Sequence, residues 1–266
     1  MASIAKQPNP SIYNLQAVQT VLSGSAPLSP DLGRIIEGIY IRSGVSVKQG
    51  GGMTESTCSV TGFAPDDEDD GRSIGWLNPN RAARIERLDD RNFSGAAPAG
   101  ATVGEIWVTG PNIMKWYYKN PKATREAIVV AGGIRWLRTG DIGYIDERGC
   151  IYIVDPLKNL IKVKGLQVAP AELEQYLLTN SDVADAAVIG AKMNGGEYPR
   201  AFVVRKTAAV TKEYLAQMIK SHFAPHKWLT GGVYFLDSIV RTRSGKVIRR
   251  ESPVIETNLQ SIRGRL

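Results

Sequence analysis

Residues able to bind a nucleotide gather in one stretch of the sequence, residues 136–174. It opens with a tight polar turn at 138–141 that ends in Asp141, and it continues as a basic loop from 158 to 164, followed by Gly165. Carboxylates bind ribose hydroxyls, and lysines neutralise a phosphate or an acyl-phosphate leaving group. Taken singly, however, each of these pieces is more typical of a solvated hairpin or a basic surface loop.

Two glycine turns and a C-terminal loop carry further candidate ligands. Backbone N–H groups at residues 24–26 (Gly24, Ser25 and Ala26) are expected to face an adenine or an acyl group. Thr54 and Glu55 follow a run of glycines, and their oxygens suit phosphate and Mg²⁺, because hard cations prefer oxygen ligands. Lys246, on a Ser-Gly-Lys loop, is a cation that can be delivered to a phosphate ester. The alternatives are turns that need glycine only for a positive φ, and an exposed basic tail.

The elements that must position these residues begin with an α/β unit. The pattern predicts a buried strand over 15–22, a helix from Pro30 with Leu32, Ile35 and Ile36 on one face, and a strand over 45–49. This order suggests a parallel layer with both glycine turns at the carboxyl ends of strands, where ligands gather in open sheets.

Further along the chain, short strands alternate with helices. A hairpin is predicted from 144–145 and 151–154 through the turn 146–149, and Asp155-Pro156 is expected to break the pattern. Pro170 suits a first helical position, and Thr211 an N-cap. The other predicted elements are a strand over 104–110, a short helix over 122–127, a helix from 170 with Leu173, Leu177 and Leu178 at helical spacing, strands over 186–190, 201–204 and 233–236, and a helix over 212–223 with an apolar stripe at Tyr214, Leu215, Met218, Ile219 and Phe223.

In this order and spacing, the motifs resemble those of the adenylate-forming acyl-CoA synthetase superfamily, and most of all those of coumarate–CoA ligases and their fungal relatives. The resemblance covers residues 15–250 and only the C-terminal half of that family's chain. It implies an α/β and α+β fold: a truncated AMP-binding N-terminal domain over 1–155, with an α/β remnant at 12–75 and a small β-barrel at 76–155, and then a mobile α+β C-terminal domain over 156–266.

The resemblance also implies a role for each candidate. Asp141 would hold the ribose of ATP, Asp155 would be the hinge before the small domain, and Glu55 would bind Mg²⁺. The implied catalytic residues are Lys246, on the α-phosphate, and Lys162 and Gln167, on the acyl-adenylate. The implied cofactor-binding residues are Gly24, Ser25, Ala26, Thr54 and Asp141 for ATP or AMP, and Lys164 and Gly165 for the path of CoA.

Several positions depart from the family pattern. Gly51 stands where the family has an aromatic residue that packs on adenine, Pro156 replaces an arginine near the ribose, and Trp116 replaces a glycine. The upstream phosphate loop ending in Pro-Lys-Gly does not occur in this sequence. Three of these differences concern the nucleotide: the missing phosphate loop, Gly51 and Pro156. Each of them is expected to weaken ligand binding by about 1–3 kcal/mol.

Two functions therefore stay open. The first is an acyl- or aryl-CoA ligase (carboxylate plus ATP to acyl-AMP, then the CoA thioester) with impaired adenylation. The second is a repurposed biosynthetic enzyme of secondary metabolism, or a binding protein, acting on an acyl or CoA-linked small molecule without ATP. The expected small-molecule partner is a carboxylic acid or an acyl thioester.

Composition narrows the remaining classes. The net charge of +7 is spread along the chain, so nucleic acid is not an expected partner. Two cysteines and two histidines make a disulfide framework or a histidine metal site improbable. No apolar run is long enough to span a bilayer, so a membrane is not expected. The cytoplasm is the expected location; the ending Gly264-Arg265-Leu266 only loosely resembles a peroxisomal signal.

Assembly is the last expectation. The family packs the strands carrying Val18, Leu22, Val45 and Val47 against a half that the resemblance does not cover. Because open strand edges and large apolar patches invite pairing, we expect a homodimer or a partner that covers this face. The alternative is that residues around 11–15 fold back over the gap.

Overall fold

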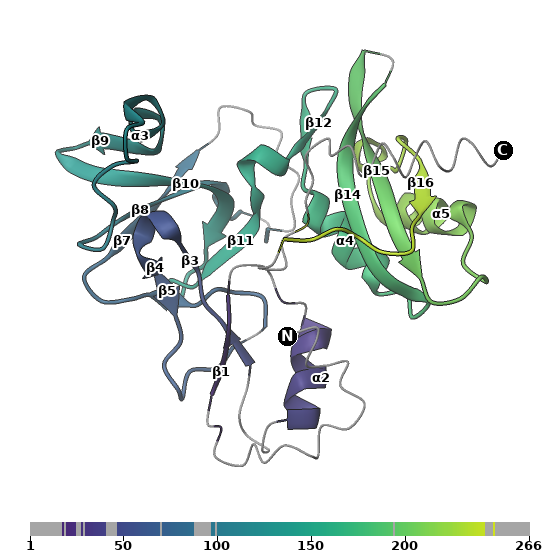
Figure 1. The fold of residues 1–266 in the computed structure, drawn as a ribbon, viewed down its shortest axis with the longest axis horizontal. Helices are drawn as coiled ribbons and strands as arrows, with labels where there is room; N and C mark the ends of the chain where they lie inside the picture. Colours follow the sequence, from purple (N-terminus) through teal and green to yellow (C-terminus); the bar gives the residue numbers. More distant parts are fainter. Residues whose placement is uncertain are drawn as a thin grey trace. The chain divides into compact units, whose positions relative to one another are not determined.

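The computed structural model describes residues 18, 20–24, 28, 30–40, 47–69, 71–87, 97–98, 100–193, 195–242 and 247. The chain divides into two compact units, Met1–Lys158 and Asn159–Leu266, and each is described by itself (Figure 1). The expected mixture of α/β and α+β structure is confirmed. None of the helices in the described part of the chain has the length and apolar character needed to cross a membrane.

The first unit begins with the expected parallel pair. Strand β1 (Val21–Ser23) pairs in parallel with β2 (Val47–Gln49), and helix α2 (Pro30–Tyr40) connects them. The Gln49 side chain fixes the segments around β2, since its amide oxygen accepts from Leu28 N at 2.8 Å and its amide nitrogen donates to Gly71 O at 2.8 Å. The predicted helix is confirmed, but its apolar face is only partly buried, since Ile36 is buried and Ile35 is 47% exposed. Consecutive helical residues point about 100° apart, so Ile35 lies at the margin of the buried stripe.

The proposed assembly face is mixed. Leu22 is 65% exposed, as an uncovered apolar residue would be, whereas Val47 is only 5% exposed. Val45 lies outside the described residues. Homodimerisation and a covering partner therefore stay predictions.

The larger part of this unit is a five-stranded antiparallel sheet. Its order is β11-β10-β8-β7, and β9 pairs with β10. A buried cluster that includes Ile106, Leu137 and Ile151 packs on it. The strands and helices of this region are β3 (Gly52–Met53), the 3₁₀ turn η2 (Thr54–Ser56), β4 (Cys58–Ser59), β5 (Thr61–Gly62), β6 (Trp76–Leu77), β7 (Ala82–Arg87), β8 (Gly104–Thr109), α3 (Pro121–Ala127), β9 (Ile128–Ala131), β10 (Ile134–Ile145) and β11 (Ile151–Pro156).

The predicted hairpin is confirmed: Tyr144 pairs with Tyr152 and Ile145 with Ile151. Another expectation in this stretch is wrong: residues 138–141 are not a turn between elements but an irregularity inside the long strand β10. Asp155-Pro156 ends the strand as expected, two residues later than the predicted bounds; Pro156 is opposite Asp141, and a 3₁₀ turn begins at the next residue. Proline is tolerated there because β11 is at the end of the sheet order, where one side of the strand needs no ladder partner.

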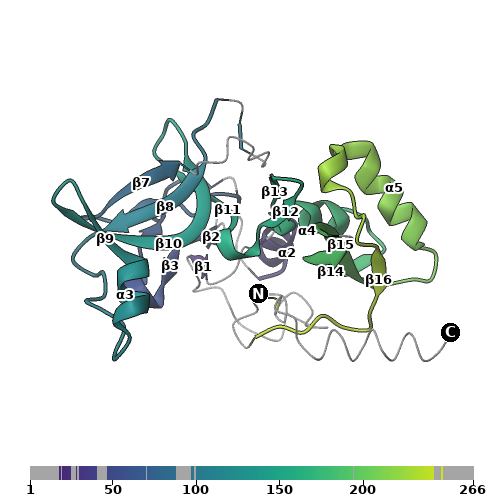
Figure 2. The ribbon, with the colours of Figure 1, turned by 90° about the horizontal axis from the view of Figure 1, so that it is seen from above.

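The second unit is an α+β domain with its own core. Strands β14 (Val183–Met193), β15 (Gly196–Arg205) and β16 (Val233–Phe235) form one sheet in that order, next to helices α4 (Pro170–Leu178) and α5 (Lys212–His222) (Figures 1 and 2). Side chains of the sheet and of both helices form one buried cluster. The remaining elements are the 3₁₀ turns η3 (Leu157–Asn159) and η4 (Pro225–Lys227) and a separate hairpin of β12 (Ile161–Val163) and β13 (Leu166–Val168).

Both predicted helix starts are confirmed. Pro170 begins α4, and the Thr211 hydroxyl accepts from Tyr214 N at 3.1 Å as the N-cap of α5. The prediction of a basic loop over 158–164 is wrong, because most of that segment is the hairpin. Leu178 and Tyr214, assigned to apolar stripes, are 37% and 55% exposed, so they lie at the margins of those stripes.

Helix α4 offers a matched test of this core. Replacing Leu173, which is fully buried, with alanine should lower the free energy of unfolding by about 2–5 kcal/mol, because it leaves a cavity between α4 and the sheet. The same change at Leu178 should stay within about 0.5 kcal/mol. Urea denaturation measures the stability change of both variants, and hydrogen exchange of the β14 and β15 amides locates it in this core. Equal effects of the two changes would contradict this assignment of the core.

Candidate functional site

Asp141 lies on a bulge of strand β10. Arg138 is in register with Trp107 and Ile142 with Glu105, so residues 139–141 of β10 stand opposite a single residue of β8, Ile106. Gly140 has a φ of +71°, a left-handed conformation that glycine adopts without strain. The bulge therefore interrupts the regular alternation of the strand immediately before Asp141.

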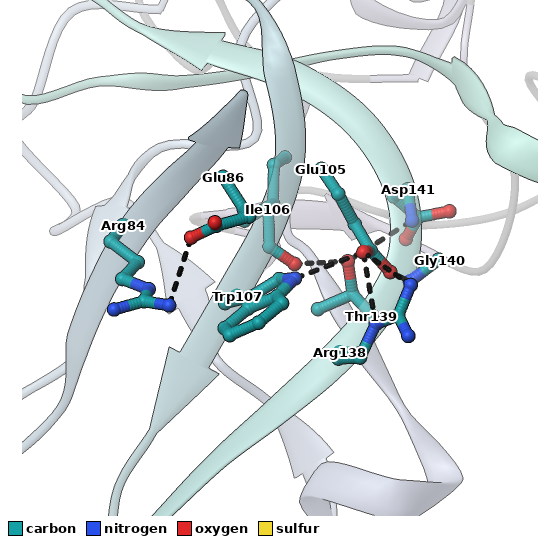
Figure 3. Close-up of polar contacts among 9 residues, drawn as sticks. All are labelled: Arg84, Glu86, Glu105, Ile106, Trp107, Arg138, Thr139, Gly140 and Asp141. Atoms are coloured by element: carbon teal, nitrogen blue, oxygen red, sulfur yellow. Dashed lines mark hydrogen bonds and ion pairs between the residues drawn. The ribbon is translucent and has the colours of Figure 1, made fainter. Parts of the chain in front are cut away.

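Two side chains fix this bulge (Figure 3). Glu105, which is 4% exposed, accepts from Gly140 N at 3.1 Å through Oε1, and Oε2 accepts from Trp107 Nε1 at 2.9 Å and from Arg138 Nε and Nη2 at 3.1 and 3.0 Å. The Thr139 hydroxyl donates to Ile106 O at 2.6 Å and accepts from Asp141 N at 3.1 Å. The half-buried Asp141 is thus held through its own amide and through that of the preceding residue.

A row of cations flanks the Trp107 indole on the same sheet. The guanidinium carbon of Arg84, on β7, lies 4.4 Å from the ring centroid, and that of Arg138, on β10, lies 5.8 Å from it. Arg84 also makes an ion pair of 2.8 Å with Glu86. Because Trp107 is in register with both arginines, the three strands present this row side by side.

Thr54 and Glu55 form the 3₁₀ turn η2, which begins after Met53. Met53 N donates to the Ser56 hydroxyl at 3.2 Å, and the carbonyl of Glu55 accepts from Met114 N at 2.8 Å. The Glu55 carboxylate accepts from the Tyr117 hydroxyl at 2.7 Å through Oε1. Burial, this hydrogen bond and the charge of Glu55 raise the pKa of Tyr117 to about 12. Glu55 is half-buried, and Thr54 is exposed.

The glycine turn before η2 is closely packed at Gly51. Its N–H donates to the Thr61 hydroxyl at 2.9 Å. A Cβ at this position would lie 2.4 Å from Ile74 Cδ1 and 2.8 Å from Thr61 Oγ1. The space next to the backbone of residue 51 is therefore filled by Ile74 and Thr61. The other glycine turn is described only at Gly24, which is exposed; Ser25 and Ala26 lie outside the described residues.

In the second unit, four predicted residues lie on one hairpin. Lys162 of β12 and Gln167 of β13 are direct cross-strand partners, and Lys164 and Gly165 are the two residues of the connecting turn. Both turn residues have positive φ, +49° and +84°, as a type I′ hairpin turn requires. The Lys162 side chain is exposed, whereas Gln167 is 6% exposed. Lys162 N donates to Glu197 Oε2 at 2.9 Å, which ties the hairpin to β15.

The structure thus brings Lys162, Gln167, Lys164 and Gly165 together, and it fixes Asp141 and the Thr54–Glu55 turn separately within the first unit. Asp155, the expected hinge residue, is buried at the end of β11. Lys246 lies outside the described residues. Across the described part of the chain, no group of three or more His, Cys, Asp or Glu side chains is arranged to hold a metal ion.

Sequence reasoning missed Glu105 and Tyr117, which hold the candidate ligands in place. Glu105 is 35 residues from Gly140 and Tyr117 is 62 residues from Glu55, so no local spacing indicates either contact. The strand that carries Glu105 was predicted, but alternation with Ile106 and Val108 places Glu105 on the opposite face of the strand and gives no sign that it is buried.

Comparisons with known proteins relate the chain to AMP-binding enzymes. The family model described as "AMP-binding enzyme" matches residues 1–118, and the one described as "AMP-binding enzyme C-terminal domain" matches residues 172–246. The acyl-CoA synthetase ACTT5 of Alternaria alternata is 41% identical over 94% of this chain and 43% of its own length. Peroxisomal OPC-8:0-CoA ligase 1 of Arabidopsis thaliana is 40% identical over 92% of this chain and 44% of its own.

Solved structures of two ATP-bound proteins are also similar to this chain. ATP-bound MatB from Rhodopseudomonas palustris is similar with a TM-score of 0.75 and 30% identity, over 91% of this chain and 45% of that one. o-Succinylbenzoate CoA synthetase (MenE) from Bacillus subtilis, in complex with ATP and a magnesium ion, is similar with a TM-score of 0.72 and 29% identity, over 94% of this chain and 49% of that one. The chain spans less than half the length of these relatives.

The Tyr117–Glu55 contact predicts a pH dependence. A phenol whose pKa is raised from 10 to about 12 contributes stability that is fully present below pH 10 and is lost as the pH rises through 12. The difference between the ultraviolet titrations of the wild-type chain and Tyr117→Phe should isolate one phenol ionising near pH 12. In Glu55→Gln the same phenol should ionise closer to pH 10. A phenol that ionises near pH 10 in the wild-type chain would contradict the contact.

The hairpin turn predicts opposite effects at its two positions. Gly165→Val should lower stability by about 1–2 kcal/mol or more, because a β-branched residue is strained at positive φ. Lys164→Asn should leave stability unchanged or raise it, since asparagine tolerates this conformation. Chemical denaturation, together with amide exchange across β12 and β13, measures both changes. A neutral Gly165→Val would show that the turn is not of this type.

Proposed function

Because the chain belongs to the adenylate-forming family of AMP-binding enzymes, we propose that it supplies part of the catalytic apparatus of an acyl- or aryl-CoA ligase. The observation that carries the proposal is the bulge of β10, which fixes the backbone of Asp141 from two sides. The reaction joins a carboxylate to CoA in two steps. A carboxylate oxygen first attacks the α-phosphorus of ATP and displaces pyrophosphate; the CoA thiol then attacks the acyl carbon and displaces AMP.

Within the first unit, the proposed roles are those of oxygen ligands. Asp141 accepts hydrogen bonds from ribose hydroxyls, and charge-assisted bonds of this type are stronger than neutral ones. Glu55 and Thr54 offer a carboxylate and a hydroxyl on one short turn, and hard oxygens of this kind suit Mg²⁺. When bound, Mg²⁺ offsets the negative charge of the phosphates. Tyr117 keeps the Glu55 carboxylate oriented through the 2.7 Å hydrogen bond.

In the second unit, the β12–β13 hairpin carries the acyl-adenylate and CoA contacts. Lys162 and Gln167 are paired across the strands, so one ligand can meet both side chains. Lys164 and Gly165 border the path of CoA from the turn. Lys246 is proposed to engage the α-phosphate during adenylation.

Adenylation by this chain is proposed to be weak. Residue 51 is a glycine and offers no aromatic ring to stack on adenine, and Ile74 and Thr61 fill the space beside it. Pro156, opposite Asp141, brings no guanidinium to the ribose. Each difference is worth about 1–3 kcal/mol of nucleotide binding.

A second candidate function uses the hairpin without ATP. The chain would then act on, or bind, an acyl or CoA-linked small molecule as a repurposed biosynthetic protein. The observation that favours it is the contrast between the two units: Gly51 and Pro156, the two departures, both lie in the first unit, whereas the hairpin of the second unit has Lys162, Gln167, Lys164 and Gly165 at the expected positions.

Calorimetric titration with ATP and Mg²⁺, with AMP and with CoA separates the two candidates. The first predicts nucleotide binding that Asp141→Asn weakens about tenfold or more, because a charge-assisted hydrogen bond is lost. Glu147→Gln, a change at an exposed carboxylate in the adjoining hairpin turn, should leave nucleotide affinity unchanged. CoA binding with no heat from ATP or AMP supports the second candidate. Nucleotide binding unaffected by Asp141→Asn contradicts the proposed ribose contact.

A further inference from the structure

Glu105 is a charged side chain in the middle of a sheet. It is 4% exposed, and its two oxygens accept four hydrogen bonds, from one indole, two guanidinium nitrogens and one backbone amide. Burying a carboxylate is strongly unfavourable unless it is paired and hydrogen-bonded. The Arg138 ion pair answers only part of this need, because the Arg138 side chain remains 38% exposed. The remaining bonds go to Trp107 and to the bulge.

The hydrogen bond from Gly140 N to Glu105 differs from the other three, because its donor is a backbone amide within the bulge. In a bulge the ladder between strands is interrupted, and the backbone groups of the extra residues need other partners. Glu105 Oε1 supplies the partner for the Gly140 amide, and Thr139 Oγ1 supplies the partner for the next amide, that of Asp141. An ionised carboxylate is the stronger acceptor of the two. The conformation before Asp141 therefore depends on a residue of another strand.

We propose that Glu105 is a positioning residue for Asp141. By accepting a hydrogen bond from Gly140 N, it holds the β10 bulge in the conformation that presents the Asp141 carboxylate to ribose hydroxyls. The part concerning ribose rests on the function proposed above. The part concerning the bulge stands on the contacts of Figure 3 alone. Glu105 itself does not need to touch the nucleotide in this role.

Glu105→Gln is the sharpest change, because glutamine keeps the shape but has one acceptor oxygen where glutamate has two. It cannot accept from both Gly140 N and the Trp107–Arg138 group. Its one oxygen should stay with the three donors of that group, so the bond from Gly140 N is lost. The matched control is Glu86→Gln. Glu86 is the β7 residue in register with Glu105, and its side chain is 45% exposed and paired with Arg84. The control makes the same chemical change one strand away from the bulge.

The first measurement is amide exchange by NMR, without nucleotide. The Gly140 and Asp141 amides should exchange about tenfold faster or more in Glu105→Gln, and at the wild-type rate in Glu86→Gln. Unchanged exchange in Glu105→Gln would overturn the proposal. Thr139→Val, which removes the acceptor of the Asp141 amide but keeps the side-chain shape, should have the same effect on that amide. It serves as the test if Glu105→Gln does not fold.

The second measurement compares ATP with 2′,3′-dideoxy-ATP. The wild-type chain and Glu86→Gln should bind ATP more tightly, Asp141→Asn should lose most of this preference, and Glu105→Gln and Thr139→Val should reduce it severalfold. A purely structural role of Glu105 would weaken both nucleotides equally and leave the ratio unchanged, and that result would overturn the proposal even if exchange became faster. If the wild-type chain shows no preference, the ribose function of Asp141 fails, and the exchange rates alone decide whether Glu105 holds the bulge.

Discussion

The bonding of one buried carboxylate, Glu105, governs the shape of the central sheet at the candidate site. A charge with 4% exposure needs donors around both oxygens, and regular antiparallel pairing between β8 and β10 would use the Gly140 amide elsewhere. The bulge turns that amide toward the carboxylate, and the left-handed φ of Gly140 makes this turn possible. Carboxylate, glycine and bulge are therefore one arrangement, and Asp141 takes its position from all three.

Glu55, like Asp141, is positioned by residues distant in the sequence, whereas the candidate ligands of the second unit are positioned locally. Glu55 is held through its carbonyl by Met114 N and through its carboxylate by Tyr117, both distant in the sequence. By contrast, the β12–β13 hairpin is specified locally, by two turn residues with positive φ. The candidate ligands of the first unit thus depend on tertiary packing, whereas those of the second unit depend on a short segment tied to β15 by the Glu197 side chain.

This difference explains which features the sequence could predict. The 144–154 hairpin, the start of α4 at Pro170 and the cap at Thr211 arise from interactions within a few residues, and all three are confirmed. The bulge at 138–141 was mistaken for a turn because Thr-Gly-Asp has the composition of both. The end of the strand at Asp155-Pro156 could be predicted from the proline, but the pairing of Pro156 within β11 depends on β11 being an edge strand, which periodicity does not reveal. The types of the site residues could be predicted, but their holders Glu105 and Tyr117 could not, since these contacts close only in the folded sheet.

The packing around Gly51 shows that one departure from the family pattern is not an isolated substitution. Thr61 Oγ1 accepts from Gly51 N and donates to Ile74 O at 2.5 Å, so the three residues form one hydrogen-bonded unit. Ile74 Cδ1 lies 2.4 Å from the position that the Cβ of any side chain at residue 51 would take, which is too close for both atoms. An aromatic ring at residue 51 and the present position of Ile74 therefore exclude each other. Placing an aromatic ring at residue 51 therefore requires Ile74 to move or shrink together with the change at Gly51.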